Sequence, residues 1–225
     1  MNKSEFLDYL VLCSNTACDR LPSLSELSQQ LGVSIATLRE QMEVARALGL
    51  IEVRPKTGIR RLPYTFRPAV RQSLAYATKV QPENFQAYSD LRNHLETAYW
   101  SQAVNSLSAE DHQKLRELVK RAKEKLNAHP PQVPHAEHRE LHLTIYSHLD
   151  NPFVTGLLEA YWELYEEMGL NMVTDLGYLQ RVWQYHEKMV EDICAGNYES
   201  GNKVLMDHAA LLSQRPKQPR NQKFE

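Results

Sequence analysis

Residues 21–53 read LPSLSELSQQLGVSIATLREQMEVARALGLIEV and decide the fold of the first part of the chain. Ser23 is placed to cap the start of a helix that Gly32 ends. Ser34 is placed to cap a second helix, which ends at Gly49. A short helix, a tight glycine turn and a serine-capped second helix predict a helix-turn-helix, whose second helix lies in the DNA major groove.

Residues 50–64 read LIEVRPKTGIRRLPY, in which two short apolar runs flank a Lys-Thr-Gly turn. This pattern predicts a small β-hairpin, and residues 6–13, FLDYLVLC, predict one more helix before the motif. We therefore expect residues 1–66 to form a winged helix-turn-helix with the hairpin as its wing. Four basic residues within eight positions of the wing suit contacts to DNA phosphates: Arg54, Lys56, Arg60 and Arg61.

The alternative for these 66 residues is a small helical domain whose basic hairpin is an ordinary solvated turn. The order of the predicted elements, the positions of the caps and the basic wing all favour DNA binding over that alternative.

The overall composition is that of an average globular protein, with 225 residues, a hydrophobic fraction of 42% and a charged fraction of 24%. The net charge is -2, so a DNA-binding surface must be a local patch. No apolar run reaches about 18 residues, which predicts no transmembrane helix and no membrane partner. The N-terminus makes a poor signal peptide. Three cysteines without a CxxC spacing fit a reducing cytosol, so we expect a cytoplasmic protein.

The rest of the chain reads as helical, so the expected fold class is mainly all-α. Residues 67–82 are expected to be a linker with a short helix, because prolines punctuate them. Residues 83–213 contain six segments with helical spacing and are expected to form an antiparallel helical bundle. Residues 214–225 are polar and basic, and we expect a disordered tail.

Histidines stand at helical spacing within the predicted bundle. His138 and His142 lie one turn apart, and His142 adjoins an apolar stripe. His186 and His208 are surrounded by apolar residues on two later helices. Neutral imidazole is a common ligand for zinc and other transition metals, but the spacing alone leaves a metal site and separate buried histidines equally open. The other histidines are interpreted as surface or loop residues: His94, His112, His129, His135 and His148.

The stretch LPSLSELSQQLGVSIATLREQ, residues 21–41, resembles the DNA-binding motif of the GntR superfamily. The second block resembles the effector domain of its FadR branch. There the family pattern D-x-x-F-H, with Asn-Pro nine residues after the histidine, has its counterpart in HRELH at residues 138–142 and NP at residues 151–152. The later family pattern H-x3-[IV]-x-x-A-[IV]-x-x-G-[DN] has its counterpart in His186, Val190, Ile193 and Gly196-Asn197, and a last histidine of the family in His208.

The resemblance implies a homodimeric bacterial transcription regulator that binds operator DNA and a small-molecule effector, often a carboxylate. It also implies a divalent metal held by an aspartate and three histidines, which here correspond to His138, in place of the aspartate, and to His142, His186 and His208. Ser25, just after the cap of the first helix of the motif, and Ile35, just after the Ser34 cap of the recognition helix, replace two residues that are usually basic, so Ser34, Thr37, Arg39 and the wing are the expected DNA contacts.

The histidine at position 138 changes the chemistry that the resemblance implies. Four neutral imidazoles leave the charge of the metal uncompensated and favour zinc, nickel or copper over manganese or magnesium. The alternative is a weakened site in which His138 faces solvent. Arg92 is predicted to bind an effector carboxylate, or else to pair with Glu96 one helical turn away. Six aromatic residues are interpreted as core: Tyr99, Trp100, Tyr161, Trp162, Tyr165 and Trp183.

Three functions compete for this sequence. The first is a transcription regulator, not an enzyme, whose operator affinity responds to a metal, an effector or both. The second is a metalloenzyme that activates water at the same histidines, with Glu140 or Glu187 as the general base. The third is a metal that only clamps the helical bundle.

Overall fold

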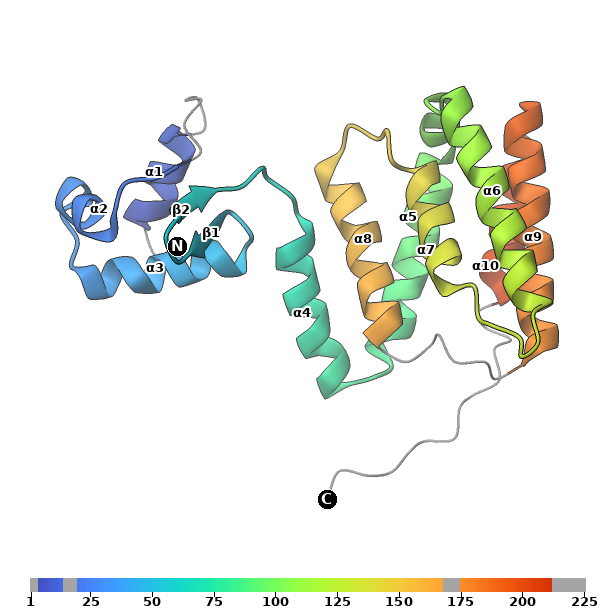
Figure 1. Ribbon diagram of the computed structural model, residues 1–225, viewed down its shortest axis with the longest axis horizontal. Helices are drawn as coiled ribbons and strands as arrows, with labels where there is room; N and C mark the ends of the chain where they lie inside the picture. Colours follow the sequence, from blue (N-terminus) through green and yellow to red (C-terminus); the bar gives the residue numbers. More distant parts are fainter. Residues whose placement is uncertain (1–3, 14–19, 168–174, 212–225) are drawn as a thin grey trace, which may run out of the picture. The chain divides into compact units, whose positions relative to one another are not determined.

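The computed structural model describes residues 4–13, 20–167 and 175–211. The chain divides into two compact units, Met1–Tyr76 and Ala77–Glu225, and each is described by itself (Figure 1). The expected tail at residues 214–225 lies outside the described residues.

The first unit is a winged helix-turn-helix, as the sequence predicts. Ser23 caps α2 through a reciprocal capping box with Glu26, and the Ser34 side chain accepts a hydrogen bond from the Thr37 amide at the start of α3. Gly32 ends α2 in the left-handed conformation, with φ of 65°. The elements of this unit are α1 (Glu5–Cys13), α2 (Leu24–Leu31), α3 (Ile35–Ala47), β1 (Ile51–Arg54) and β2 (Gly58–Arg61).

The wing is a two-stranded antiparallel hairpin in which Ile51 pairs with Arg61 and Arg54 pairs with Gly58. The inward-facing isoleucines of the hairpin, Ile51 and Ile59, join the core that the three helices form. The alternation of strand side chains therefore anchors one face of the wing and leaves its basic residues on or near the surface.

The helix α4 (Arg67–Val80) spans the division between the two units. The sequence predicts only a short helix in this segment, whereas the structure forms 14 helical residues. Pro68 is the second residue of α4, where a proline is tolerated because the first-turn amides have no partner within the helix.

The second unit is a helical bundle (Figure 1). Helix α6 packs on α7 and α9, α10 packs on α5 and α9, and α8 packs on α5 and α7. Its elements after α4 are α5 (Asn84–Asn105), α6 (Ala109–Leu126), α7 (His135–Ile145), α8 (Pro152–Glu167), α9 (Leu176–Ala195) and α10 (Tyr198–Leu211). No helix among the described residues has the length and apolar character to cross a membrane.

The close approach of α10 to α5 depends on Gly201. A Cβ at this position would lie 2.8 Å from the ring of Trp100, which is buried. The Trp100 indole donates a hydrogen bond to the Tyr198 carbonyl at the start of α10. Helix α10 is thereby held against the core at the end opposite His208.

Candidate metal centre

Three helices of the bundle bring four histidines together. Helix α7 supplies His138 and His142, while α9 supplies His186 and α10 supplies His208. One ligand atom from each residue lies within 4.8 Å of the others. The sequence-predicted set is therefore a single spatial cluster.

The spacing of the cluster suits a small divalent cation. The Nε2 atoms of His142 and His186 are 3.1 Å apart. Two nitrogens bound to a tetrahedral zinc at about 2.0–2.1 Å lie about 3.3–3.4 Å apart, so small movements of these side chains produce ligand geometry.

His138 faces the other three histidines. Its ring centroid is 4.6 Å from that of His186, 5.2 Å from that of His142 and 6.0 Å from that of His208. Trp162 lies across its other side, at a centroid distance of 4.6 Å. In the structure the half-buried His138 directs its imidazole toward the cluster and Trp162 rather than toward solvent.

The cluster leaves buried nitrogen atoms without hydrogen-bond partners. These atoms are Nε2 of His138, Nδ1 of His186 and Nδ1 of His208. An unsatisfied buried polar atom costs about 1–3 kcal/mol, and proteins place few of them together. A metal ion would take a lone pair from one nitrogen of each histidine, and one nitrogen from each ring lies within 4.8 Å of the others, so the residues fit the metal that the sequence suggests.

Burial keeps the four imidazoles neutral. It lowers the pKa of His138, His142 and His186 well below the usual value, and neighbouring positive groups add to that effect. The pKa of His208 falls to about 3, again mainly through burial. Neutral imidazole is the form that binds a metal, so no proton has to leave the site at pH 7.

A buried ion pair lies behind His142. The side chains of Arg92 and Glu96, on α5, are 3% and 1% exposed, and Arg92 Nε lies 2.9 Å from Glu96 Oε1. Arg92 Nη2 is also 2.8 Å from His142 Nδ1. The Arg92 guanidinium also lies over two aromatic rings, 5.0 Å from the centroid of Tyr161 and 5.2 Å from that of Trp162.

Arg92 therefore pairs with Glu96, as one of the two sequence interpretations has it, and also contacts a histidine of the cluster. Burial raises the pKa of the Glu96 carboxyl, while the adjacent Arg92 guanidinium opposes that shift. Sequence reasoning considered Glu96 only as a partner of Arg92 and missed its approach to the cluster.

Some residues that the sequence assigns to the core or the surface also border the site. Trp162 and Trp183 are buried, as predicted, and their rings flank His138. His135 differs from the expected surface histidine, because its side chain is only 16% exposed and its ring stacks on Tyr165. His135, His138 and His208 together border a cavity of about 20 Å³, which is large enough for a water-sized group.

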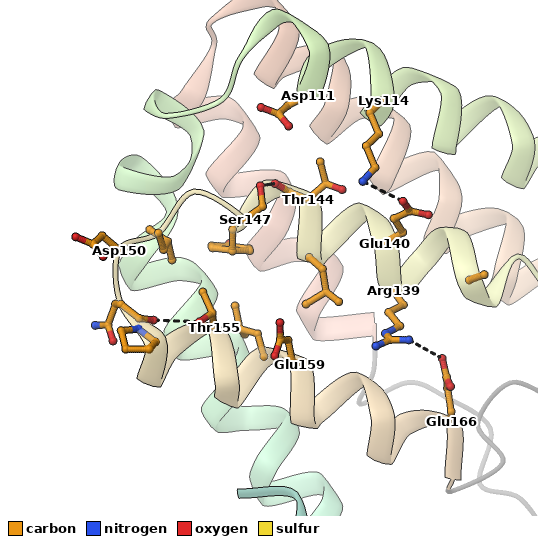
Figure 2. A pocket seen from close by; sticks show the side chains of 17 residues that line it. Asp111, Lys114, Arg139, Glu140, Thr144, Ser147, Asp150, Thr155, Glu159 and Glu166 are labelled. Carbon is orange, nitrogen blue, oxygen red and sulfur yellow. Dashed lines mark hydrogen bonds and ion pairs between the residues drawn. The ribbon is translucent and has the colours of Figure 1, made fainter. Parts of the chain in front are cut away.

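A larger hollow, of about 840 Å³, lies along the other face of α7, between α6 and α8 (Figure 2). Four of its charged residues form two ion pairs, with Lys114 Nζ 2.9 Å from Glu140 Oε1 and Arg139 Nη1 3.9 Å from Glu166 Oε1. None of the four clustered histidines lines it. We call this hollow the α7 groove.

The predicted DNA-binding residues lie at the start of α3 and in the wing. Ser34 and Thr37 are exposed and are linked by a side-chain hydrogen bond of 2.9 Å. Arg39 is exposed on α3. In the wing, Arg54 forms an ion pair with Glu52 at 2.7 Å, and Lys56 occupies the turn with φ of 69°. Arg60 is exposed and Arg61 is half-buried on β2.

The model of the FCD domain family matches residues 88–211, which is more than half of the chain. The chain belongs to the FCD domain family. FCD is the C-terminal effector domain of the GntR family, so this protein is a GntR-family transcriptional regulator with an FCD effector domain. The match includes all four clustered histidines together with Arg92 and Glu96.

Solved structures share this fold. Streptococcus agalactiae GntR is 16% identical, with a TM-score of 0.62 over 94% of this chain and 97% of its own. E. coli McbR/YncC is 18% identical, with a TM-score of 0.47 over 95% of this chain and all of its own. A search of curated proteins found no match. At 16% identity, the likeness to the Streptococcus agalactiae structure shows the fold alone, a winged helix-turn-helix followed by a helical domain.

Proposed function

We propose that this FCD regulator is a cytoplasmic homodimer that binds operator DNA through its winged helix-turn-helix and senses a divalent transition metal at His138, His142, His186 and His208. A small carboxylate effector completes the signal. The observation that carries the proposal is the cluster of four ligand atoms within 4.8 Å, three of whose histidines keep a buried nitrogen without a partner.

The donor set supports zinc or nickel as the metal. All four donors are imidazole nitrogens, and such sites prefer these ions to manganese or magnesium, which favour oxygen ligands. The cavity of about 20 Å³ beside His138 and His208 offers room for one water or carboxylate oxygen. An anionic ligand there would offset the charge that four neutral ligands leave on the metal.

The DNA-binding part of the proposal rests on α3 and the wing. Arg39 has no ion pair or hydrogen bond to any described residue, which leaves its guanidinium available for a guanine edge or a phosphate. The wing presents Lys56 and Arg60 on its exposed side. A homodimer would place two such units on two operator half-sites.

The experiment measures operator affinity with and without metal. Purified protein, stripped with a chelator, first selects its preferred duplex from a random pool, and the affinity for that duplex is then measured by fluorescence anisotropy at fixed salt, with and without zinc or nickel. We expect metal to change the dissociation constant by about 5–150-fold, the range of typical allosteric coupling. The same affinity with and without bound metal would overturn the sensing role.

The same samples separate the two alternative functions. A metal that only clamps the bundle would raise the melting temperature and leave operator affinity unchanged. A metalloenzyme would need a base beside the metal. Glu140 and Glu187, the two candidate general bases, instead form ion pairs with basic residues of α6. Glu140 pairs with Lys114, and Glu187 pairs with Lys123.

A further inference from the structure

One ring nitrogen of the cluster has two incompatible neighbours. His142 Nδ1 lies 2.8 Å from Arg92 Nη2 and 3.2 Å from Glu96 Oε1. A guanidinium can only donate a hydrogen bond, whereas an ionised carboxylate can only accept one. Because a neutral imidazole carries one ring proton, His142 Nδ1 can satisfy one of these neighbours at a time.

The position of that proton decides which neighbour is satisfied. If the proton is on Nε2, Nδ1 accepts from Arg92, and Nε2–H donates to His186 Nε2 at 3.1 Å. This arrangement occupies Nε2, the atom of His142 that faces His186. If the proton is on Nδ1, it is donated to Glu96, and Nε2 presents a free lone pair to the centre of the cluster.

The Glu96 carboxylate lacks a hydrogen-bond donor as long as His142 Nδ1 accepts its hydrogen bond from Arg92. Both carboxylate oxygens of Glu96 are buried without an aligned hydrogen-bond donor, although the Arg92 Nε atom is within ion-pair distance. A donor on His142 Nδ1 would supply what Glu96 lacks. Carboxylates that accept from a ligating histidine in this way orient the ring and strengthen the nitrogen that binds the metal.

We propose that Arg92 and Glu96 are opposed positioning residues that set the tautomer of His142, with Arg92 favouring the metal-free form and Glu96 the metal-bound form. This inference rests on the proposed function, since it assumes that His142 binds the metal through Nε2. Metal binding moves the proton from Nε2 to Nδ1, replaces the hydrogen bond to Arg92 by one to Glu96, and leaves Arg92 Nη2 without its acceptor.

The released donor explains how Arg92 can serve a carboxylate effector. In the structure the Arg92 guanidinium contacts Glu96, His142 and Asn93 Oδ1. After the switch, Nη2–H needs a new acceptor in a buried place, and a carboxylate oxygen is a suitable one. Metal and anionic effector would then strengthen each other's binding, because coupling between two ligands is reciprocal.

The first test uses the unaltered full-length protein. Histidine side chains are labelled with 15N, and the protonation of each ring nitrogen of His142 is assigned by NMR before and after one equivalent of zinc. We expect a proton on Nε2 and a bare Nδ1 in the metal-free protein, and a proton on Nδ1 in the zinc-bound protein. A proton on Nδ1 in both states would overturn the switch.

The second test compares zinc affinity in Glu96→Gln and Arg92→Gln, measured by competition with a chromogenic chelator. We expect Glu96→Gln to weaken zinc binding by about 10–100-fold, the usual cost of losing such a carboxylate, and Arg92→Gln to strengthen it. A pair that serves structure alone would weaken zinc binding in both variants. Asn93→Ala is the matched control, because Asn93 contacts Arg92 but not His142, and it should leave zinc affinity unchanged.

The two levels of proposal fail in different ways. If the unaltered protein binds neither zinc nor nickel, the metal-sensing function is wrong. If it binds zinc but the two variants shift affinity in the same direction, only the tautomer switch is wrong. Melting temperatures measured in parallel show whether each variant is folded, and the labelled unaltered protein tests the switch even if one variant is not.

Discussion

Helix α7 has two polar faces that are satisfied in opposite ways. On the α7 groove face, Glu140 pairs with Lys114 and Arg139 pairs with Glu166, and these side chains are about one-third to one-half exposed. On the other face, His138 and His142 meet two more imidazoles in the core, where three histidine nitrogens have no partner.

This difference distinguishes a structural polar group from a ligand-binding one. The paired charges of the α7 groove are about one-third to one-half exposed, so water can complete their hydrogen bonds and they do not call for a ligand. Buried imidazole nitrogens without protein partners carry a cost that a bound ligand removes. The α7 groove is therefore a weaker candidate for the ligand-binding site than the histidine cluster, although it is larger. Buried polar atoms without hydrogen-bond partners indicate a ligand better than cavity volume does.

The largest effect is expected when one candidate metal ligand is removed from the buried face of α7. We expect His142→Ala or His186→Ala to abolish stoichiometric metal binding, because each removes a central donor and leaves three imidazoles with altered packing. Elemental analysis of the purified variants measures the metal content directly. His148→Ala is the control, since His148 is half-exposed and pairs with Asp111. Full metal content in both cluster variants would show that the histidines are not ligands.

Removing the metal should lower the melting temperature, because the histidine nitrogens of the cluster then lose their ligand. At a free zinc concentration of one hundred times its dissociation constant, binding to the native state adds about 2.7 kcal/mol of stability. For a chain of this size that corresponds to a rise of about 5–11 °C in melting temperature. Thermal unfolding with zinc and with chelator measures the difference. His142→Ala should show none, and an equal melting temperature in both conditions for the unaltered protein would contradict a buried site with a metal requirement.

Local features of the fold were predictable from the sequence because their causes are local. The serine caps at Ser23 and Ser34 and the left-handed Gly32 each act within a few residues. The length of α4 was underestimated, because Pro68 reads as a breaker unless it falls in the first helical turn.

The candidate site was predictable as a set of residues but not as a geometry. The spacing of the four histidines, together with the family resemblance, identified the set. The inward orientation of His138 depends on Trp162 of α8, and the approach of Glu96 to His142 joins residues on α5 and α7. Such contacts follow from how helices pack, which periodicity within one helix does not reveal.

The contrast between paired and unpaired groups extends to the recognition helix. Arg39 has no partner among the described residues, whereas Arg46 on the same helix pairs with Glu43. We expect Arg39→Ala to weaken operator binding by about 1–3 kcal/mol if the guanidinium reads a guanine, and Arg46→Ala to have a smaller effect. Anisotropy with the selected duplex measures both. Equal effects would mean that pairing on α3 does not mark the DNA-binding residues.

Replacing one histidine of the cluster by an acid tests whether the neutral charge of the four ligands selects the metal. His138→Asp restores the acid that the resemblance places at this position, and it adds an anionic oxygen ligand to three imidazoles. We expect affinity to shift toward manganese relative to zinc, by roughly tenfold or about 1.4 kcal/mol. Competition between the two ions, followed by elemental analysis, measures the ratio. An unchanged ratio would mean that His138 does not select the metal.

The smallest effect is expected on the groove face of α7. Glu140→Gln removes the carboxylate that lies 2.9 Å from Lys114 and 3.7 Å from Arg121, but these side chains are about half exposed. Exposed ion pairs contribute about 0–1 kcal/mol, so unfolding in urea should show a change within that range, and zinc affinity should not change. This variant also removes one of the two candidate general bases. Loss of zinc from Glu140→Gln would mean that the two faces of α7 act as one site, and the distinction between them would fail.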